Sequence, residues 1–272
     1  MSLLFFTAIG LLAATFGSLV GLGGGVIIVP ALVYLGPVFV GQSISVSTAV
    51  GTSLAVLIFT ALSSTMTFVK QKRVDFKSGW LFIVTCAPGA MVGSYITQFV
   101  DADSFQLSFG FFMLFMAILL IVRDRIKPLN VRWSVNRTYT DGAGQTFNYG
   151  YSLVPALALG LAVGFISGLF GIGGGSLFVP AMVLLFRYPP HVATATSMFV
   201  ILLSSLMGTF TKLSLGQVDL WMVVCLAPTA IIGGWLGARI ASKLSSAKLL
   251  WVLRISFVII AVKMILEGFK IL

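Results

Sequence analysis

The sequence predicts an all-α polytopic membrane protein, built as an inverted-topology tandem repeat with glycine-broken discontinuous or re-entrant helices. Of its 272 residues, 58% are hydrophobic and 9% charged, whereas soluble domains carry about 25% charged residues. No Asp, Glu, Lys, Arg or His precedes Lys70, and a helix of that length would extend about 100 Å. The hydrocarbon core measures only about 30 Å. The chain must therefore enter the bilayer repeatedly.

Charge and cysteine content narrow the class further. Lys and Arg outnumber Asp and Glu by 17 to 7, and the basic residues stand in short runs beside apolar segments, as between Lys70 and Lys77. This placement is a topology signal, so we expect the lipid bilayer as partner and no nucleic acid. The only cysteines are Cys86 and Cys225, which form no metal-binding pair. We expect no metal, no cofactor and no enzymatic activity.

Charges and turn residues divide the chain into apolar blocks. A single polar stretch of some length, residues 123–150, separates two sets of them. We therefore divide the chain into a first membrane repeat (1–122), a linker loop (123–150) and a second membrane repeat (151–272). The apolar blocks are residues 3–41, 43–69, 78–100 and 105–122 in the first repeat, and 151–186, 192–211, 220–238 and 249–269 in the second.

The two repeats are related by matching motifs in the same order. Gly21–Ala31 (GLGGGVIIVPA) matches Gly171–Ala181 (GIGGGSLFVPA) at seven of eleven positions. Further along, GTS at 51–53 corresponds to ATS at 195–197, and Val-Asp at 74–75 to Val-Asp at 218–219. Internal duplication of this kind is typical of membrane transporters.

The basic residues predict the orientation of the repeats. If each glycine-broken block crosses twice, or dips in and returns, then 13 of the 17 Lys and Arg fall on one face. The positive-inside rule makes that face cytoplasmic. Each half then crosses an odd net number of times, which inverts the second half relative to the first. We expect an inner-membrane protein with a cytoplasmic linker and both termini outside.

The triple glycines predict unwound backbone within the membrane. Glycine costs about 1 kcal/mol relative to Ala inside a helix, and irregular backbone at membrane depth survives only when it is buried in protein or lines a cavity. Amides beside a new helix start attract anions. We therefore predict substrate binding at the two glycine runs and hinges at the prolines that follow; close helix packing is the alternative. The residues are Gly23, Gly24, Gly25, Gly173, Gly174 and Gly175, with Pro30 and Pro180 as hinges.

Hydroxyl side chains recur at matched positions after each glycine motif. Hydroxyls can donate to anionic oxygens without adding charge, and we predict that they line the same site. Alternatively, they bond carbonyl groups of their own helix. The predicted residues are Thr48, Thr52 and Ser53 in the first repeat, and Thr194, Thr196 and Ser197 in the second.

Ionisable residues offer fewer candidates. Asp75 and Asp219 each stand just before an apolar block, which is typical of a helix N-cap. His191, the only histidine, and Arg254, within the last apolar block, are the candidates for proton coupling. For the two cysteines, apolar packing is favoured over a role in dithiol redox chemistry.

Taken together, these motifs resemble the sulfite exporter TauE/SafE family, also called TSUP. The paired GxGGG-x3-VP motifs, the Gly/Ala-Thr-Ser segments and the Ala-Pro helices at 87–88 and 227–228 carry the resemblance. It implies a secondary transporter that moves small sulfur-containing anions, such as sulfite, sulfoacetate or other organosulfonates, by alternating access of two inverted repeats. An anion channel and a dithiol redox protein are the alternatives. The sequence leaves open the anion, the direction of transport, proton coupling and the oligomeric state.

Overall fold

The protein is an all-α polytopic membrane protein in a computed structural model. The structure describes residues 2–41, 43–122, 133–140 and 146–244, together with seven positions after residue 250. Within this part, six helices are long and apolar enough to cross a bilayer. The polytopic class predicted from composition is confirmed.

The first repeat consists of a broken helical unit followed by three long helices. Helix α1 (Ser2–Val20) stops at the glycine run, and α2 (Gly25–Pro30) continues through a π-helical turn (Ala31–Leu35) into α3 (Gly36–Val40). The chain then forms α4 (Val46–Lys70), α5 (Phe76–Ile96), a short 3-10 turn (Thr97–Phe99) and α6 (Ala102–Val122).

The described part of the second repeat follows the order of the first from its broken unit through two long helices. Helix α7 (Leu153–Phe170) stops at the second glycine run, and α8 (Gly175–Leu185) follows it. Helices α9 (Pro190–Ser214) and α10 (Leu220–Lys243) correspond to α4 and α5. The position of Arg254 lies outside the described residues.

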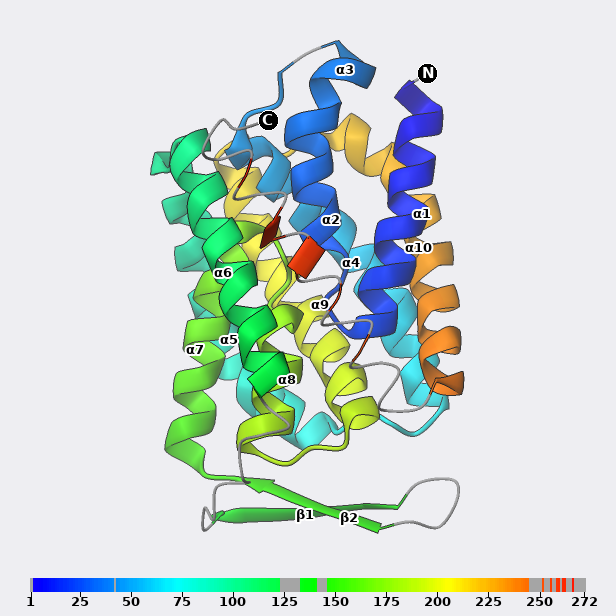
Figure 1. The fold of residues 1–272 in the computed structure, drawn as a ribbon, viewed down its shortest axis with the longest axis vertical. Helices are drawn as coiled ribbons and strands as arrows, with labels where there is room; N and C mark the ends of the chain where they lie inside the picture. Colours follow the sequence, from blue (N-terminus) through cyan, green and yellow to red (C-terminus); the bar gives the residue numbers. More distant parts are fainter. Residues whose placement is uncertain are drawn as a thin grey trace.

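The two ends of each broken unit lie close together. The ring of Phe39, in α3, stacks on Phe5, near the start of α1, at 4.6 Å. In the second repeat, the amide of Gly150, just before α7, donates to the carbonyl of Phe186, just after α8, at 3.1 Å. Figure 1 shows α1 and α7 beginning at opposite ends of the molecule.

The linker contains regular structure where the sequence predicted only a loop. Strands β1 (Val135–Thr140) and β2 (Thr146–Tyr151) form an antiparallel hairpin, which lies across one end of the helices (Figure 1). β-Branched and aromatic residues favour strands, and Tyr149 and Tyr151 are buried. The hairpin is therefore docked on the helices by its aromatic side chains.

Helices of one repeat pack mainly on helices of the other. Helix α1 lies along α10, α7 lies along α5, and α4 lies along α9 at the centre. Glycines allow this close approach: a methyl group at Gly164 or Gly168 of α7 would overlap the carbonyl oxygens of Cys86 or Ala90 in α5. Most of the helix packing is therefore between the two repeats, and an isolated repeat would lack these contacts.

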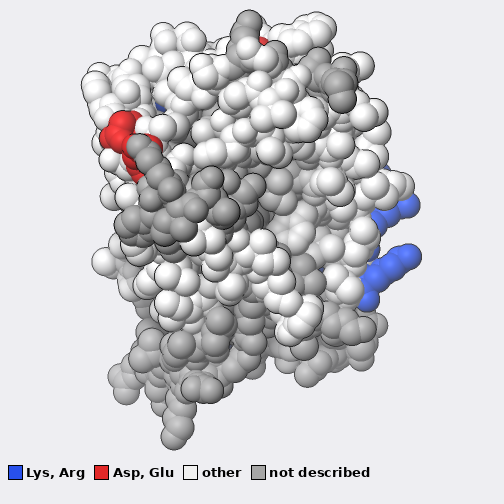
Figure 2. Space-filling view, turned by 45° about the horizontal axis from the view of Figure 1, so that its top comes forward, with Lys and Arg blue, Asp and Glu red and all other residues white. Residues whose placement is uncertain are grey.

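The two ends of the molecule differ in charge. At the hairpin end, Lys72, Arg73 and Arg137 line one pocket, and Lys70 and Arg239 line another. The predicted gathering of these basic segments at one end is therefore confirmed. Figure 2 looks obliquely onto the opposite end, where the described surface is mostly uncharged, with an acidic group at one side.

Candidate functional site

Both glycine runs form tight turns that interrupt the helices, as predicted. Gly21, Gly23 and Gly24 have φ values of 82°, 82° and 102°, and Gly171, Gly173 and Gly174 have 69°, 76° and 73°. Left-handed backbone is accessible to glycine without a steric cost. Since all residues at 21–25 and 171–175 are buried, the turns lie inside the protein. We call them the first and second glycine turns.

The two glycine turns touch each other through their backbones. A methyl group at Gly25 would overlap the carbonyl oxygen of Gly171, and one at Gly175 would overlap the carbonyl oxygen of Gly21. Gly25 and Gly175, the first residues of α2 and α8, are therefore required for the close approach of the two turns. The packing role considered from the sequence is present, and it joins one repeat to the other.

Serine hydroxyls from the central helices hold the glycine turns in place. Ser53 of α4 donates to the carbonyl oxygen of Gly171 at 2.9 Å. Ser197 of α9 donates to the carbonyl oxygen of Gly21 at 3.0 Å. Each repeat thus supplies the hydroxyl that supports the glycine turn of the other.

Threonine hydroxyls make a second pair of exchanged contacts. The amide of Asp219 donates to the Thr52 hydroxyl at 3.1 Å, and the amide of Asp75 donates to the Thr196 hydroxyl at 3.0 Å. Both carboxylates cap helices as predicted: Asp75 accepts from the amide of Ser78 at 3.3 Å, and Asp219 from that of Met222 at 3.0 Å.

The glycine turns also carry polar groups for which the described residues supply no hydrogen-bond partner. The first amides of α2 and α8 precede the first helical hydrogen bonds, which Ile27 and Leu177 make to the carbonyls of Gly24 and Gly174. Thr194 is 1% exposed, its Cα stands 3.1 Å from where a methyl group of Gly21 would lie, and its hydroxyl has no partner among the described residues.

A second unpaired hydroxyl, which sequence reasoning missed, lies beside the second glycine turn. Ser167 in α7 is fully buried, and its hydroxyl lies 3.6 Å from the position of a methyl group at Gly174. It too has no hydrogen-bond partner in the described part of the chain. The corresponding position in the first repeat is Gly17, so the repeat comparison did not select it.

The remaining predicted residues lie farther from the glycine turns. Thr48 lies in the first turn of α4, where its hydroxyl is 2.9 Å from that of the N-cap Ser45. Pro30 ends α2 just before the π-helical turn, and Pro180 lies inside α8. His191 lies in the first turn of α9, within electrostatic range of Arg73.

Lys212 is a further polar residue that sequence reasoning missed. It lies near the end of α9, is fully buried, and is the single charged residue buried among the helices that the structure describes. Its ammonium donates to the hydroxyl of Ser47 at 2.6 Å and to Gln217 Oε1 at 3.0 Å. A lone lysine directly after the apolar block 192–211 was the available signal, because a buried charge in a membrane protein is usually functional.

A basic pocket lies at the opposite end of α9. It has a volume of about 190 Å³, and three cationic side chains line it together with Asp75 and Tyr149. The guanidinium of Arg73 has a buried nitrogen without a hydrogen-bond partner among the described residues. The cationic residues are Lys72, Arg73 and Arg137.

The two cysteines belong to separate helix contacts. Cys86 and Cys225 are both buried and free. Cys86 packs in α5 against the glycine face of α7, whereas α10, which carries Cys225, packs on α1 and α4. This burial agrees with the packing role that we favoured from the sequence.

Broken helices buried at the centre of a helical membrane protein are typical of secondary transporters. The comparisons agree with a membrane transporter. The family described as Sulfite exporter TauE/SafE matches residues 6–264, and the chain belongs to this family.

Curated relatives are membrane transporters by name. The probable membrane transporter protein YunE of Bacillus subtilis is 43% identical over 270 residues, covering 98% of this chain and 99% of the relative. A probable membrane transporter protein of Methanocaldococcus jannaschii is 28% identical over 87% of this chain and 85% of its own. YfcA of Escherichia coli, with the same description, is 26% identical over 91% and 81%. No solved structure matches this chain.

Proposed function

We propose that this protein is a secondary transporter of small sulfur-containing oxyanions, such as sulfite, sulfoacetate or other organosulfonates, and that the anion binds beside the two touching glycine turns, at the helix starts that follow them. The observation that carries the proposal is the pair of buried helix starts at Gly25 and Gly175, which lie against each other and beside the unpaired hydroxyls of Thr194 and Ser167. Free amides at helix N-termini are a favourable environment for an anion.

The binding groups in this proposal are dipoles. The amides of Gly24, Gly25 and Gly173–Gly175 donate to the anion, assisted by Thr194. The Gly23 amide, which was predicted to take part, instead donates to the carbonyl of Gly17 at 3.1 Å. Thr52, Ser53, Thr196 and Ser197 hold the turns and adjoining helices. Pro30 and Pro180 fix the helices that leave the turns. Binding without a full charge gives modest affinity, which suits a site that must also release its substrate.

Charged side chains lie away from the glycine turns, toward the two ends of α9. Lys212 lies toward the C-terminal end of α9, and Arg73, with His191, lies at its N-terminal end. In this proposal both cations raise the local concentration of anions. His191 is the described candidate for proton coupling, and Arg254 is a second candidate outside the described residues.

Transport requires movement between the two repeats. The glycine turns are buried in this arrangement, so an anion bound there is enclosed. We infer an inverted repeat with re-entrant units at 2–40 and 153–185, because the paired contacts exchange between halves and α1 and α7 start at opposite ends (Figure 1). Rocking one repeat against the other would open each side in turn. The basic hairpin end is then cytoplasmic, in the inner membrane, with both termini outside.

The test is uptake of labelled sulfite and sulfoacetate into proteoliposomes, with Thr194→Val as the decisive variant. Because the Thr194 hydroxyl bonds no described protein group, valine removes it without breaking a protein hydrogen bond. We expect the KM for the transported anion to rise about tenfold, which corresponds to about 1.4 kcal/mol. Unfolding temperature should stay unchanged.

Thr209→Val is the matched control. Thr209 is buried on the same helix, its hydroxyl is also unpaired among the described residues, and it lies fifteen positions from Thr194, about 22 Å along α9. Equal KM values for wild type and Thr194→Val would remove Thr194 from the site, and absence of saturable flux for every sulfur oxyanion would overturn the proposed function. Flux that rises linearly with concentration would favour an anion channel.

A further inference from the structure

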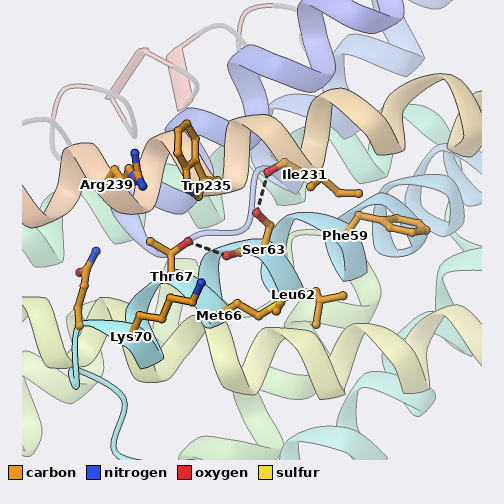
Figure 3. A pocket seen from close by; sticks show the side chains of 10 residues that line it. Phe59, Leu62, Ser63, Met66, Thr67, Lys70, Ile231, Trp235 and Arg239 are labelled. Atoms are coloured by element: carbon orange, nitrogen blue, oxygen red, sulfur yellow. Dashed lines mark hydrogen bonds between the residues drawn. The ribbon is translucent and has the colours of Figure 1, made fainter.

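A groove on the outside of the helix bundle, separate from the glycine turns, lies between α4 and α10. It has a volume of about 440 Å³. Figure 3 shows Lys70 and Arg239 on the two facing helices at one end of the groove and Phe59 toward the other. The described residues that line it are Phe59, Leu62, Ser63, Met66, Thr67, Lys70, Gln71, Ile231, Trp235 and Arg239.

The hydroxyl groups in the floor of the groove already donate hydrogen bonds within the protein. The hydroxyl of Ser63 donates to the carbonyl of Ile231 at 2.7 Å, and that of Thr67 donates to the carbonyl of Ser63 at 2.9 Å (Figure 3). The rest of this part is apolar, and Leu62, Met66 and Ile231 are exposed. An apolar groove of this kind suits a hydrocarbon chain.

Polar groups gather only at the basic end. The guanidinium carbon of Arg239 lies 3.9 Å from the centre of the Trp235 ring, and Arg239 is exposed. Lys70 is exposed on the facing helix. Gln71 Oε1 is buried and accepts no hydrogen bond from the described residues. The set therefore offers two cations for an anionic group and one acceptor for a hydroxyl donor.

The length of the groove fits one leaflet. Phe59 and Lys70 are eleven positions apart on α4, which is about 16 Å along the helix, or about half of the 30 Å hydrocarbon thickness. The cations lie near the helix ends, where the headgroups of the basic leaflet would be. Basic pockets between transmembrane helices on the cytoplasmic side are suited to anionic headgroups.

We propose that this groove binds one anionic phospholipid of the phosphatidylglycerol type, with its phosphate between Lys70 and Arg239 and an acyl chain along Leu62, Met66 and Trp235. A hydroxyl of the glycerol headgroup donates to Gln71 Oε1. The bound lipid fills the seam between α4 of the first repeat and α10 of the second. It therefore stabilises the contact between the repeats.

The experiment measures thermal unfolding of the purified full-length protein in a non-ionic detergent. Phosphatidylglycerol, phosphatidylcholine and glycerol phosphate are added separately. We expect phosphatidylglycerol to raise the unfolding temperature by several degrees, because a ligand that binds only the folded state stabilises it. Phosphatidylcholine and glycerol phosphate should shift it by less than a degree.

Two variants test the two parts of the groove. Lys70→Gln with Arg239→Gln should abolish the phosphatidylglycerol shift, and Leu62→Trp should reduce it by occupying the apolar part while all charges remain. Lys243→Gln is the matched control, since Lys243 is an exposed basic residue one turn farther along α10 and does not line the groove. Far-UV circular dichroism without lipid identifies any variant that fails to fold.

Three outcomes would overturn the lipid site. These are an unchanged phosphatidylglycerol shift in both variants, an equal shift with phosphatidylcholine, or a loss in Lys243→Gln as large as in the double variant. The last would indicate general attraction between a basic surface and anionic lipid. None of these readouts depends on which anion the protein transports.

Discussion

The two glycine turns have nearly the same backbone but different side chains around them. Both turns use left-handed glycines, both present a carbonyl to a serine of the other repeat, and both touch the opposite turn through a glycine without room for a methyl group. Their surroundings are unequal. Thr194 corresponds to Val50, and Lys212 to Phe68. The duplicated part is thus the scaffold, while the polar groups available to a ligand are concentrated in the second repeat.

This difference distinguishes residues that stabilise the fold from residues that are available to a ligand. The scaffold residues satisfy each other in pairs across the repeats, so a change in one repeat leaves an unmatched group in the other. Thr194, Ser167 and Lys212 have no such duplicate. We therefore expect substitutions of paired residues to lower the stability of both halves. Substitutions of unpaired residues should weaken binding and transport of the anion with little effect on stability.

The largest effect is expected for a methyl group at the contact between the glycine turns. In Gly25→Ala and Gly175→Ala, the new Cβ would overlap the carbonyl oxygen of Gly171 or Gly21, and backbone cannot move aside as a flexible side chain can. Each change should lower the free energy of unfolding by about 3 kcal/mol or more, and should reduce the yield of folded protein, as measured by thermal unfolding of the purified protein.

Gly216→Ala serves as the comparison for these substitutions. Gly216 has a φ of +67°, but nothing lies within 4 Å of the methyl position. Only backbone strain of about 1 kcal/mol is expected there. If Gly25→Ala lowered the free energy of unfolding no more than Gly216→Ala, the close contact between the glycine turns would not limit stability.

Removal of the unpaired charge should come next in size and should act on transport. In Lys212→Met, Ser47 still donates to Gln217 Oε1 at 2.6 Å, so no polar group is left without a partner. Replacing a buried charge with an apolar side chain is often neutral or stabilising. We expect an unchanged or higher unfolding temperature and a KM about tenfold higher in the proteoliposome assay.

Lys77→Met is the matched control, because Lys77 is an exposed lysine in the first turn of α5. Its removal lowers the net charge by the same amount without touching the interior. If both variants raised KM equally, Lys212 would act only through the overall charge of the protein.

The fold could be predicted further than the site, for a physical reason. Hydropathy and the triple glycines indicate helices and their interruptions directly, since both are local properties of the chain. The partners of Ser53 and Thr52 are in the other repeat, more than a hundred residues away. A sequence pattern showed that these hydroxyls recur, but only the packing of α4 beside α9 shows that they support the opposite repeat. The hairpin at 135–151 was missed because its aromatic residues are stabilised by docking on the helices.

The serine pair offers a finer test of the same symmetry. Ser53 donates to the carbonyl of Gly171 alone, whereas Ser197 lies 2.8 Å from the carbonyl of Thr194 in its own helix as well as 3.0 Å from that of Gly21. A divided hydrogen bond contributes less to either acceptor. Ser53→Ala should therefore destabilise the protein by about 1–2 kcal/mol and Ser197→Ala by about half as much, measured as shifts in thermal unfolding.

Ser108→Ala is a suitable reference for this pair, since the Ser108 hydroxyl bonds only carbonyls of its own helix. Its loss should cost less than either change at the glycine turns. Equal costs for Ser53→Ala and Ser197→Ala would mean that the two supports are energetically the same, and the asymmetry would then be confined to Thr194, Ser167 and Lys212.

The smallest expected effect concerns the helix cap at Asp75, whose stability we expect to depend on pH. Asp75 accepts a hydrogen bond from the Tyr149 hydroxyl at 3.1 Å, a contact supplied by the linker hairpin. Burial, and then the charge of Asp75, raise the pKa of Tyr149 above its ordinary value. The phenol is a donor only while protonated, so its contribution is complete below the unfolded pKa of about 10 and is lost as the pH rises from there toward the folded value.

Tyr149→Phe should therefore destabilise the protein by about 1 kcal/mol at pH 8, and the difference from wild type should shrink as the pH is raised from 10 to 11. Thermal unfolding across this range measures it, with Tyr95→Phe, at an exposed position of α5, as the reference. A difference that stayed constant with pH would mean that Tyr149 acts by packing against Tyr188, whose ring centroid lies 4.2 Å from its own. In that case the hydrogen bond to Asp75 would contribute nothing to the stability of this cap, and the linker would support the second repeat only through its apolar surface.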